Sequence, residues 1–134
     1  PISAQLHQRR GISKTFVAVS DDEPARVLGY YALTACEVLT EELPEDLAKK
    51  LPRQVPGIRL GRLAVDRSVQ GQGLGEHLLM DAIDRSRRVL EHIGIHALFV
   101  DAKDERAAAF YRKYGFRPLP EDSLKLVLPL AGLP

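Results

Sequence analysis

The feature that most constrains this chain is a glycine-rich loop between an apolar run and an amphipathic one. Residues 58–65 are mostly apolar and predict a buried strand, while residues 76–90 carry apolar side chains at helical spacing. Between them lie Gly71, Gly73 and Gly75. Glycines let the backbone bring several N–H groups close to an anion, and the following helix adds the positive end of its dipole. The sequence therefore predicts a strand, a diphosphate-binding loop and a helix.

The spacing of these glycines separates the loop from two better known phosphate motifs. Gly75 comes too early to be the third glycine of the dinucleotide-binding fingerprint, and the loop has no Walker-type lysine. We therefore expect mainly main-chain donors, supplied by Gln70, Gly71, Gln72, Gly73, Leu74 and Gly75. An ordinary glycine-rich turn between a strand and a helix is the alternative interpretation.

Strand-like and helix-like segments alternate along the rest of the chain. Apolar or β-branched runs predict strands at residues 15–19, 27–34, 58–65, 95–100 and 124–128. Apolar periodicity predicts helices at residues 43–51, 76–90 and 105–113, and a rigid loop is expected between Pro52 and Pro56. The run at 95–100 is apolar on both faces, which is typical of a buried parallel strand. With no linker or repeat, we expect a single domain over residues 1–134.

The composition limits the classes of protein to consider. No apolar run approaches the ~18 residues of a membrane span, and no signal-peptide pattern opens the chain. Cys36 is the single cysteine and the four histidines share no metal-ligand spacing, so we expect neither a disulfide nor a metal site. These features predict a soluble cytoplasmic protein that binds no membrane. The net charge of +1 neither requires nor excludes a polyanionic partner.

Three segments of the second half resemble the GNAT superfamily of N-acetyltransferases. Residues 62–66, the loop Gln70-x-x-Gly73-x-Gly75 and residues 104–116 follow the order and approximate spacing of the GNAT core. The resemblance implies an α/β GNAT fold, with a mixed central sheet, splayed parallel strands and flanking helices, and acetyl-coenzyme A as cofactor. In that fold a bulge splays the central strand, and the strand pairs with the pantetheine arm. The corresponding residues are Leu63, Ala64 and Val65.

The same resemblance assigns the catalytic group. Tyr111 matches the tyrosine that protonates the departing thiolate, and an ordinary tyrosine pKa of about 10 keeps it protonated at neutral pH. Phe110 and Asp104 would contact the cofactor. Two alternatives remain: Tyr111 suits a packing role with a satisfied hydroxyl, and Asp104 suits a helix N-cap. Tyr114 is the rival acid, although its place at the expected helix end favours packing.

The first half is similar to the acetyltransferase toxins of bacterial type II toxin–antitoxin modules. The similarity lies in residues 11–17, 29–33 and 51–56. It implies acetyl transfer to the α-amino group of aminoacyl-tRNA, which blocks translation, and a ribbon-helix-helix antitoxin as partner; a homodimer stays open. No general base stands out in the sequence. An α-amine, with a pKa near 7.7–8.0, has an appreciable neutral fraction at pH 7, whereas a lysine has almost none, so such an acceptor makes that absence tolerable.

A tRNA substrate requires basic residues near the acceptor entrance. The candidates occur in short basic clusters, which otherwise form solvated surface: Arg9, Arg10, Lys14, Lys49, Lys50, Arg53, Arg112 and Lys113. Two other functions remain open, a GNAT enzyme for a small amine or a protein N-terminus, and a non-catalytic cofactor-binding or interaction domain. GNAT proteins usually have a strand and one or two helices before the first hairpin. Because only residues 1–14 precede it here, we expect a truncated N-terminus.

Overall fold

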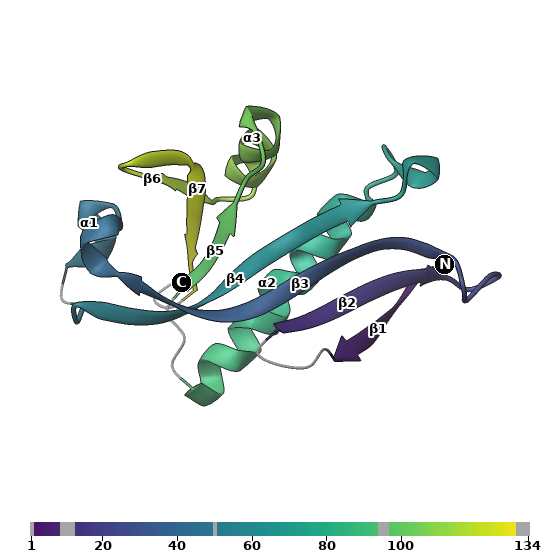
Figure 1. The fold of residues 1–134 in the computed structure, drawn as a ribbon, viewed down its shortest axis with the longest axis horizontal. Helices are drawn as coiled ribbons and strands as arrows, with labels where there is room; N and C mark the ends of the chain where they lie inside the picture. The colour runs from purple at the N-terminus through teal and green to yellow at the C-terminus, as the bar shows by residue number, and fades with distance from the viewer. Residues whose placement is uncertain (1, 9–12, 50, 94–96, 131–134) are drawn as a thin grey trace. The chain divides into compact units, whose positions relative to one another are not determined.

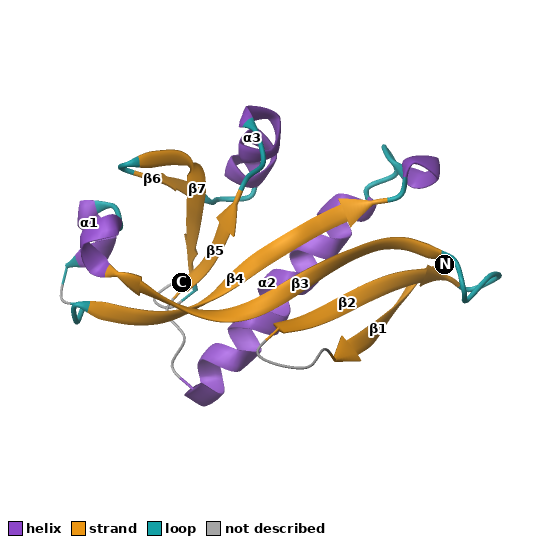
Figure 2. Cartoon of the chain, in the orientation of Figure 1, coloured by secondary structure: helices purple, strands orange, loops and turns teal. Residues whose placement is uncertain are grey.

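The computed structural model describes residues 2–8, 13–49, 51–93 and 97–130 (Figure 1). The chain divides into two units, one formed by Pro1–Thr34 and Leu60–Arg85 and the other by Ala35–Arg59 and Ser86–Pro134. Strands β3 (Val27–Leu39) and β4 (Gln54–Val65) and helix α2 (Leu74–Ile93) contribute to both units. Figure 2 shows that the chain contains both strands and helices, as expected for an α/β protein.

The strands of the first unit follow the order β1-β2-β3-β4, and β1, β2 and β3 are antiparallel to their neighbours within this trio. Strand β1 (Ile2–Gln8) pairs with β2 (Ser13–Ser20), and β2 pairs with β3 through a register that shifts between Ala18 and Val19. Phe16 lies opposite Tyr31 in this register, and their rings stack with centroids 5.1 Å apart. Both side chains are buried, so this cross-strand aromatic pair helps to fix the pairing of β2 with β3.

Helix α2 presents an apolar stripe. Four members of the predicted stripe are buried, namely Leu78, Leu79, Ala82 and Ile83. Leu74, the first helical residue, is also buried, so the helix begins two residues earlier than expected. A short 3-10 turn, η2 (Arg67–Val69), lies between β4 and this helix. The predicted strand, glycine loop and helix are therefore confirmed.

The second unit has the strand order β3-β4-β5-β7-β6. Strand β5 (Ala97–Asp101) and the short β6 (Arg117–Leu119) both pair antiparallel with β7 (Asp122–Pro129), and α3 (Glu105–Lys113) contacts β7. The unit has its own core, built from Val38, Leu43, Val55, Ala97, Phe99 and Val127. Among the described residues, none of the helices is both long and apolar enough to cross a membrane.

Two predicted boundaries were wrong near the middle of the chain. The helix expected at 43–51 is only α1 (Glu45–Ala48), preceded by the 3-10 turn η1 (Thr40–Glu42), because Pro44 and Lys49 both have extended ψ angles. The loop expected between Pro52 and Pro56 instead becomes strand from Gln54 onward. Val55 is 1% exposed within the core, and a proline is tolerated in a strand where no ladder N–H is needed.

Two strands were not predicted. Strand β1 has alternating apolar and polar residues, the pattern of a strand with one covered face, but it stands before the first strongly apolar run. Strand β6 has three residues including Pro118, too few for periodicity to be detectable. Both are secured by pairing with a neighbouring strand, which is a tertiary effect that local sequence does not report.

Candidate active site

The end of β4 is fixed by side chains before the glycine loop begins. Asp66 accepts hydrogen bonds from the backbone N–H of Ser68, at 3.1 Å, and from the Ser68 hydroxyl. Those bonds hold the pKa of Asp66 below its ordinary value. Arg26 donates to Ser68 Oγ at 2.5 Å, and the Asp66 N–H donates to the Leu28 carbonyl at 2.8 Å. The strand end, the η2 turn and β3 are thereby tied together.

The loop itself has the geometry of an anion cradle. Gly71 and Gly73 both have φ of +82°, in the region that glycine adopts without steric cost. The Gln70 side chain donates back to the Val65 carbonyl at 3.1 Å, and the His77 N–H donates to the Gly73 carbonyl at 3.0 Å. Among the hydrogen bonds of the described residues, none uses the N–H groups of residues 71–75. These donors, at the start of α2, are available to a diphosphate.

A cavity of about 480 Å³ opens beside this loop in the first unit. Arg26, Gln72, Leu74 and His77 are among its lining residues, so the cavity combines basic and polar groups with an apolar wall. Leu74 is buried while Gln72 is exposed, and Gly75 has no left-handed φ. Of the three loop glycines, only Gly71 and Gly73 are therefore required by backbone conformation.

An irregularity in β4 stands immediately before the residues expected to bind pantetheine. Arg62 has φ of +53°, which is uncommon for a residue with a side chain and marks local backbone strain. Leu63, Ala64 and Val65 follow it and are all half-buried. The backbone distortion thus falls where the resemblance implied a bulge.

Tyr111 lies on α3 with its ring in the second unit's packing. The residue is 7% exposed, and its ring makes edge contacts with Phe110 and Phe116 at centroid distances of 5.4 and 5.5 Å. The Phe116 contact follows from the helix end: Gly115, with φ of +97°, donates to the Arg112 carbonyl, and Phe116 N–H donates to the Tyr111 carbonyl. This Schellman motif folds Phe116 back onto the tyrosine ring.

The hydroxyl of Tyr111 differs from its ring in having no partner among the described residues. Among the described residues it makes no hydrogen bond, and none of their buried side-chain oxygen or nitrogen atoms lacks a partner. The hydroxyl therefore reaches solvent, while burial of the ring raises the tyrosine pKa above its ordinary value. A protonated hydroxyl with no partner among the described residues is compatible with a general acid, and the catalytic role stays a prediction. Tyr114 ends the helix and packs against Phe110, as expected.

Asp104 caps α3. Its Oδ1 accepts the Ala107 N–H at 2.8 Å, which satisfies one of the unpaired donors of the first helical turn. The N-cap interpretation is therefore confirmed, and a cofactor contact by the exposed carboxylate stays a prediction.

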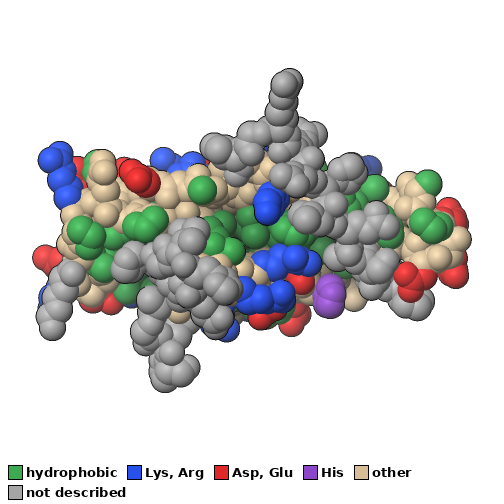
Figure 3. All heavy atoms as spheres, turned by 90° about the horizontal axis from the view of Figure 1, so that it is seen from below, with side chains coloured by type: hydrophobic (Ala, Val, Ile, Leu, Met, Phe, Trp, Pro, Cys, Tyr) green, Lys and Arg blue, Asp and Glu red, His purple; other side chains and the backbone are tan. Residues whose placement is uncertain are grey.

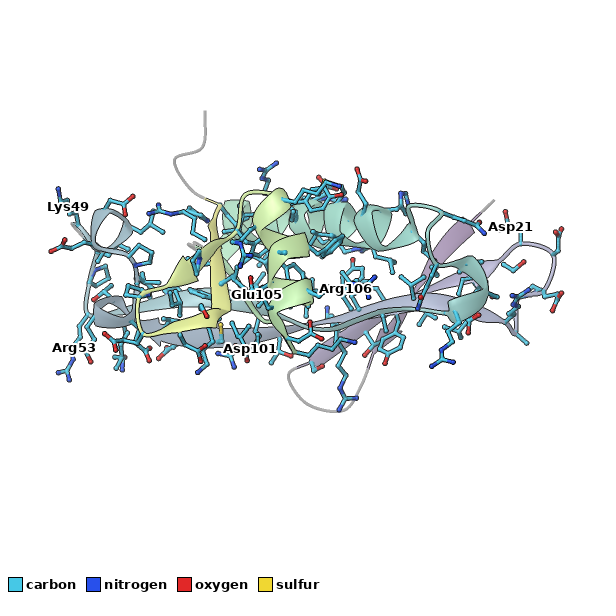
Figure 4. All side chains as sticks on the ribbon, turned by 90° about the horizontal axis from the view of Figure 1, so that it is seen from above. Asp21, Lys49, Arg53, Asp101, Glu105 and Arg106 are labelled. Atoms are coloured by element: carbon cyan, nitrogen blue, oxygen red, sulfur yellow. The ribbon has the colours of Figure 1, made fainter. Side chains whose placement is uncertain are left out.

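The basic candidates are dispersed. Lys49 and Arg53 are exposed at one end of the second unit, where Figure 4 shows both side chains directed outward, and Lys14 is exposed on β2 of the first unit. Arg112 is held by Glu105 at 2.6 Å, and Lys113 lies 5.6 Å from the Tyr114 ring centroid. On the face drawn in Figure 3, basic side chains lie among acidic ones.

Three of the basic candidates, Arg9, Arg10 and Lys50, lie outside the described residues. In the part of the chain that is described, no group of three or more His, Cys, Asp or Glu side chains could hold a metal ion.

Sequence reasoning missed a polar cluster that holds α2 against β3. The hydroxyl of Tyr31, a fully buried residue, donates to Asp81, and Arg85 Nε donates to the same carboxylate at 2.9 Å. The Arg85 guanidinium also lies 4.2 Å from the Phe16 ring centroid. Burial, and then the bond to Asp81, raises the pKa of Tyr31. The detectable signal is the four-residue spacing of Asp81 and Arg85, which places the two side chains on the same helix face.

Several known proteins are similar to this chain in sequence and in fold. The chain is 43% identical over 119 residues to the tRNA-acetylating toxin of Mycobacterium tuberculosis (strain ATCC 25618 / H37Rv), spanning 89% of this chain and 70% of that protein. A solved structure of AtaT complexed with acetyl-methionyl-tRNAfMet is 37% identical, with a TM-score of 0.82, covering 88% of this chain and 71% of AtaT.

A second AtaT structure contains a tyrosine-to-phenylalanine mutant bound to acetyl-CoA and the C-terminus of the antitoxin AtaR. It is 33% identical, with a TM-score of 0.72, covering 88% of this chain and 68% of that one. The family model for the acetyltransferase (GNAT) domain matches residues 11–118. The glycine cradle, the distorted β4 and the tyrosine of α3 thus lie inside that match, and the chain belongs to the GNAT acetyltransferase family.

Proposed function

We propose that this chain is a toxin that transfers the acetyl group of acetyl-CoA to the α-amino group of aminoacyl-tRNA and so blocks translation. The main observation that supports aminoacyl-tRNA as the acceptor is the 43% identity to a tRNA-acetylating toxin over 89% of the chain. The AtaT complex with acetyl-methionyl-tRNAfMet supports the same class of acceptor.

The cofactor site is built mostly from main-chain groups. The N–H groups of residues 71–75 suit the diphosphate of acetyl-CoA for two reasons. They belong to a loop at the start of a helix, in which Gly71 and Gly73 have left-handed φ angles, and they have no other partner among the described residues. The main chain of Leu63, Ala64 and Val65 would pair with pantetheine beyond the distorted Arg62. When bound, acetyl-CoA supplies an activated acetyl thioester.

The chemistry then requires one proton donor. The neutral α-amine would attack the thioester carbonyl carbon and form a C–N bond, the C–S bond would break to leave a thiolate, and the surplus proton on the nitrogen would pass to water. Tyr111 would donate its hydroxyl proton to the sulfur and regain a proton from water, and its raised pKa keeps the proton in place until thiolate charge develops. Phe110 and Asp104 complete the proposed cofactor contacts, with Asp104 also holding the first turn of the helix that carries Tyr111.

The biological setting follows from the acceptor. We place the protein in the cytoplasm, where charged tRNA is found, and propose one acetyltransferase domain over residues 1–134. The AtaT complex with part of AtaR supports an antitoxin partner, for which we propose the ribbon-helix-helix class.

The phosphate groups of tRNA require basic contacts. Our leading candidates are Lys14, Lys49 and Arg53, because Arg112 is already paired with Glu105. A homodimer stays a prediction from the resemblance.

The decisive experiment offers labelled acetyl-CoA with charged tRNA, uncharged tRNA, free amino acids and polyamines as parallel acceptors. We expect label on charged tRNA alone, and its loss with Tyr111→Phe. Periodate-treated tRNA, which cannot be charged, is the matched control.

Each other result would select a different function. Label on polyamines or free amino acids would identify a small-amine GNAT enzyme. Binding of acetyl-CoA without transfer to any acceptor would support the non-catalytic domain, and failure to bind acetyl-CoA would contradict the proposed site itself.

A further inference from the structure

The structure requires glycine at position 29 for a different reason than at the loop positions. Gly71 and Gly73 have left-handed φ angles, and a Cβ added to either would meet nothing within 4 Å, so conformation explains them. Gly29 has no positive φ, but a Cβ placed on it would lie 2.9 Å from the Ala64 carbonyl oxygen and 2.9 Å from Leu78 Cδ1. Space, rather than backbone conformation, therefore requires glycine at this position of β3.

The atoms around Gly29 belong to both parts of the proposed cofactor site. The Ala64 carbonyl lies on the strand segment assigned to pantetheine, and Leu74 Cδ2, 3.3 Å from the same Cβ position, belongs to the loop residue that opens α2. The neighbouring Leu28 carbonyl accepts the Asp66 N–H at 2.8 Å, which joins β3 to the start of the loop. One backbone position thus contacts β4 and the first turns of α2.

We infer that Gly29 is a positioning residue of the acetyl-CoA site: its missing side chain lets β3, the Ala64 backbone and the first turns of α2 approach closely enough to set the cradle. This inference rests on the proposed function. Leucine methyl groups can rotate away from a new Cβ, whereas a backbone carbonyl moves only with its strand. Gly29→Ala should therefore displace the main chain that holds the cofactor.

Two other glycines provide matched controls for Gly29→Ala. A Cβ at Gly57 would lie 2.5 Å from Phe99 Cε2 and 3.1 Å from the Ala97 carbonyl oxygen, so Gly57→Ala overpacks the second unit's core. A Cβ at Gly61 would meet nothing within 4 Å, so Gly61→Ala adds a methyl group in open space on β4. Gly57→Ala thus shows the effect of lost stability alone, and Gly61→Ala shows the effect of replacing a strand glycine where no clash arises.

The experiment measures acetyl-CoA affinity by equilibrium dialysis, thermal stability, and deuterium exchange at residues 63–66 and 73–78. Overpacking against backbone predicts a rise of about tenfold in the Kd of Gly29→Ala, with faster exchange in both segments. Gly57→Ala should lose stability while its Kd and its exchange in those segments match the parent. Equal Kd and exchange changes in Gly29→Ala and Gly57→Ala would overturn the inference.

A second variant covers the case in which Gly29→Ala fails to fold. Gly29→Ala combined with Leu78→Val removes the clash with the leucine methyl but keeps the clash with the Ala64 carbonyl. The affinity loss should persist in this double variant, and full recovery of affinity would contradict the inference. If the parent protein itself binds no acetyl-CoA, the proposed function fails, and deuterium exchange alone decides whether Gly29 positions the loop.

Discussion

At the scale of single residues, Tyr111 combines a buried ring with a hydroxyl that no described side chain or backbone group binds. Replacing it by phenylalanine keeps the ring contacts with Phe110 and Phe116 and removes only the hydroxyl, which is the proposed proton donor. We expect Tyr111→Phe to lower kcat by about 10²–10⁴-fold, with stability and acetyl-CoA affinity unchanged. Steady-state kinetics together with urea unfolding test this expectation.

The pH profile offers a further check on the same residue. Burial raises the pKa of Tyr111 above its ordinary value, so the proposed acid stays protonated throughout the neutral range. At every pH up to about 10, the rate should therefore show no decrease that arises from loss of this proton. If Tyr111→Phe retains more than about a tenth of the parent kcat, Tyr111 is not the principal acid.

At the scale of elements, the loop before α2 depends on backbone shape more than on side chains. Gly73 has φ of +82° with free space around its Cβ position, so a substitution there is opposed by conformation alone. Asparagine tolerates this region better than alanine, so the acetyl-CoA affinity should decrease in the order Gly73, Gly73→Asn, Gly73→Ala. Equilibrium dialysis gives the ranking, and equal affinities for all three would exclude a shape-dependent cradle.

The attachment of α2 to β3 predicts an acid dependence of stability. Burial raises the pKa of Asp81, but hydrogen bonds from Tyr31 and Arg85 outweigh it, so this pKa lies below the ordinary 3.8. The carboxylate therefore stabilises the fold above about pH 4, and the stabilisation disappears as pH falls through the lowered native pKa.

Tyr31→Phe removes one of those hydrogen bonds. We expect the free energy of unfolding to fall by about 1–3 kcal/mol at pH 7, and by less as the pH falls below the lowered native pKa of Asp81, where the carboxylate is protonated in both states. Urea unfolding of both proteins across this range tests the expectation; a difference that does not change with pH would show that the loss comes from packing.

The elements also show what the sequence could predict. The glycine loop, α2 and α3 were found because periodicity, glycines and charges agreed over many residues. Strand β6 and the short α1 were missed or misplaced because three or four residues carry too little periodicity, and their limits depend on tertiary pairing. The Tyr31 cluster escaped for a related reason: one partner comes from β3 and the other from α2, 50 residues apart.

At the scale of the whole molecule, a net charge of +1 means that the proposed affinity for tRNA has to come from local groups. Lys49 and Arg53 are exposed at one end of the second unit, whereas Arg112 is paired with Glu105. Lys49→Ala with Arg53→Ala should weaken tRNA binding and reduce its salt slope by about two, one unit per phosphate contact. Arg112→Ala should change the slope less. Filter binding at several salt concentrations distinguishes them, and an unchanged slope would place the RNA elsewhere.

A cofactor site made mainly of backbone groups has an evolutionary consequence. Most mutations change side chains and leave the main-chain N–H groups and carbonyls in place. There are therefore few positions at which a single substitution would destroy the proposed diphosphate site. Loss-of-function alleles recovered from cells that escape such a toxin would then concentrate at Gly29, Gly71, Gly73 and Tyr111. The proposed phosphate contacts, in contrast, are side chains that a single mutation replaces, so selection of the acceptor would change more readily than binding of the donor.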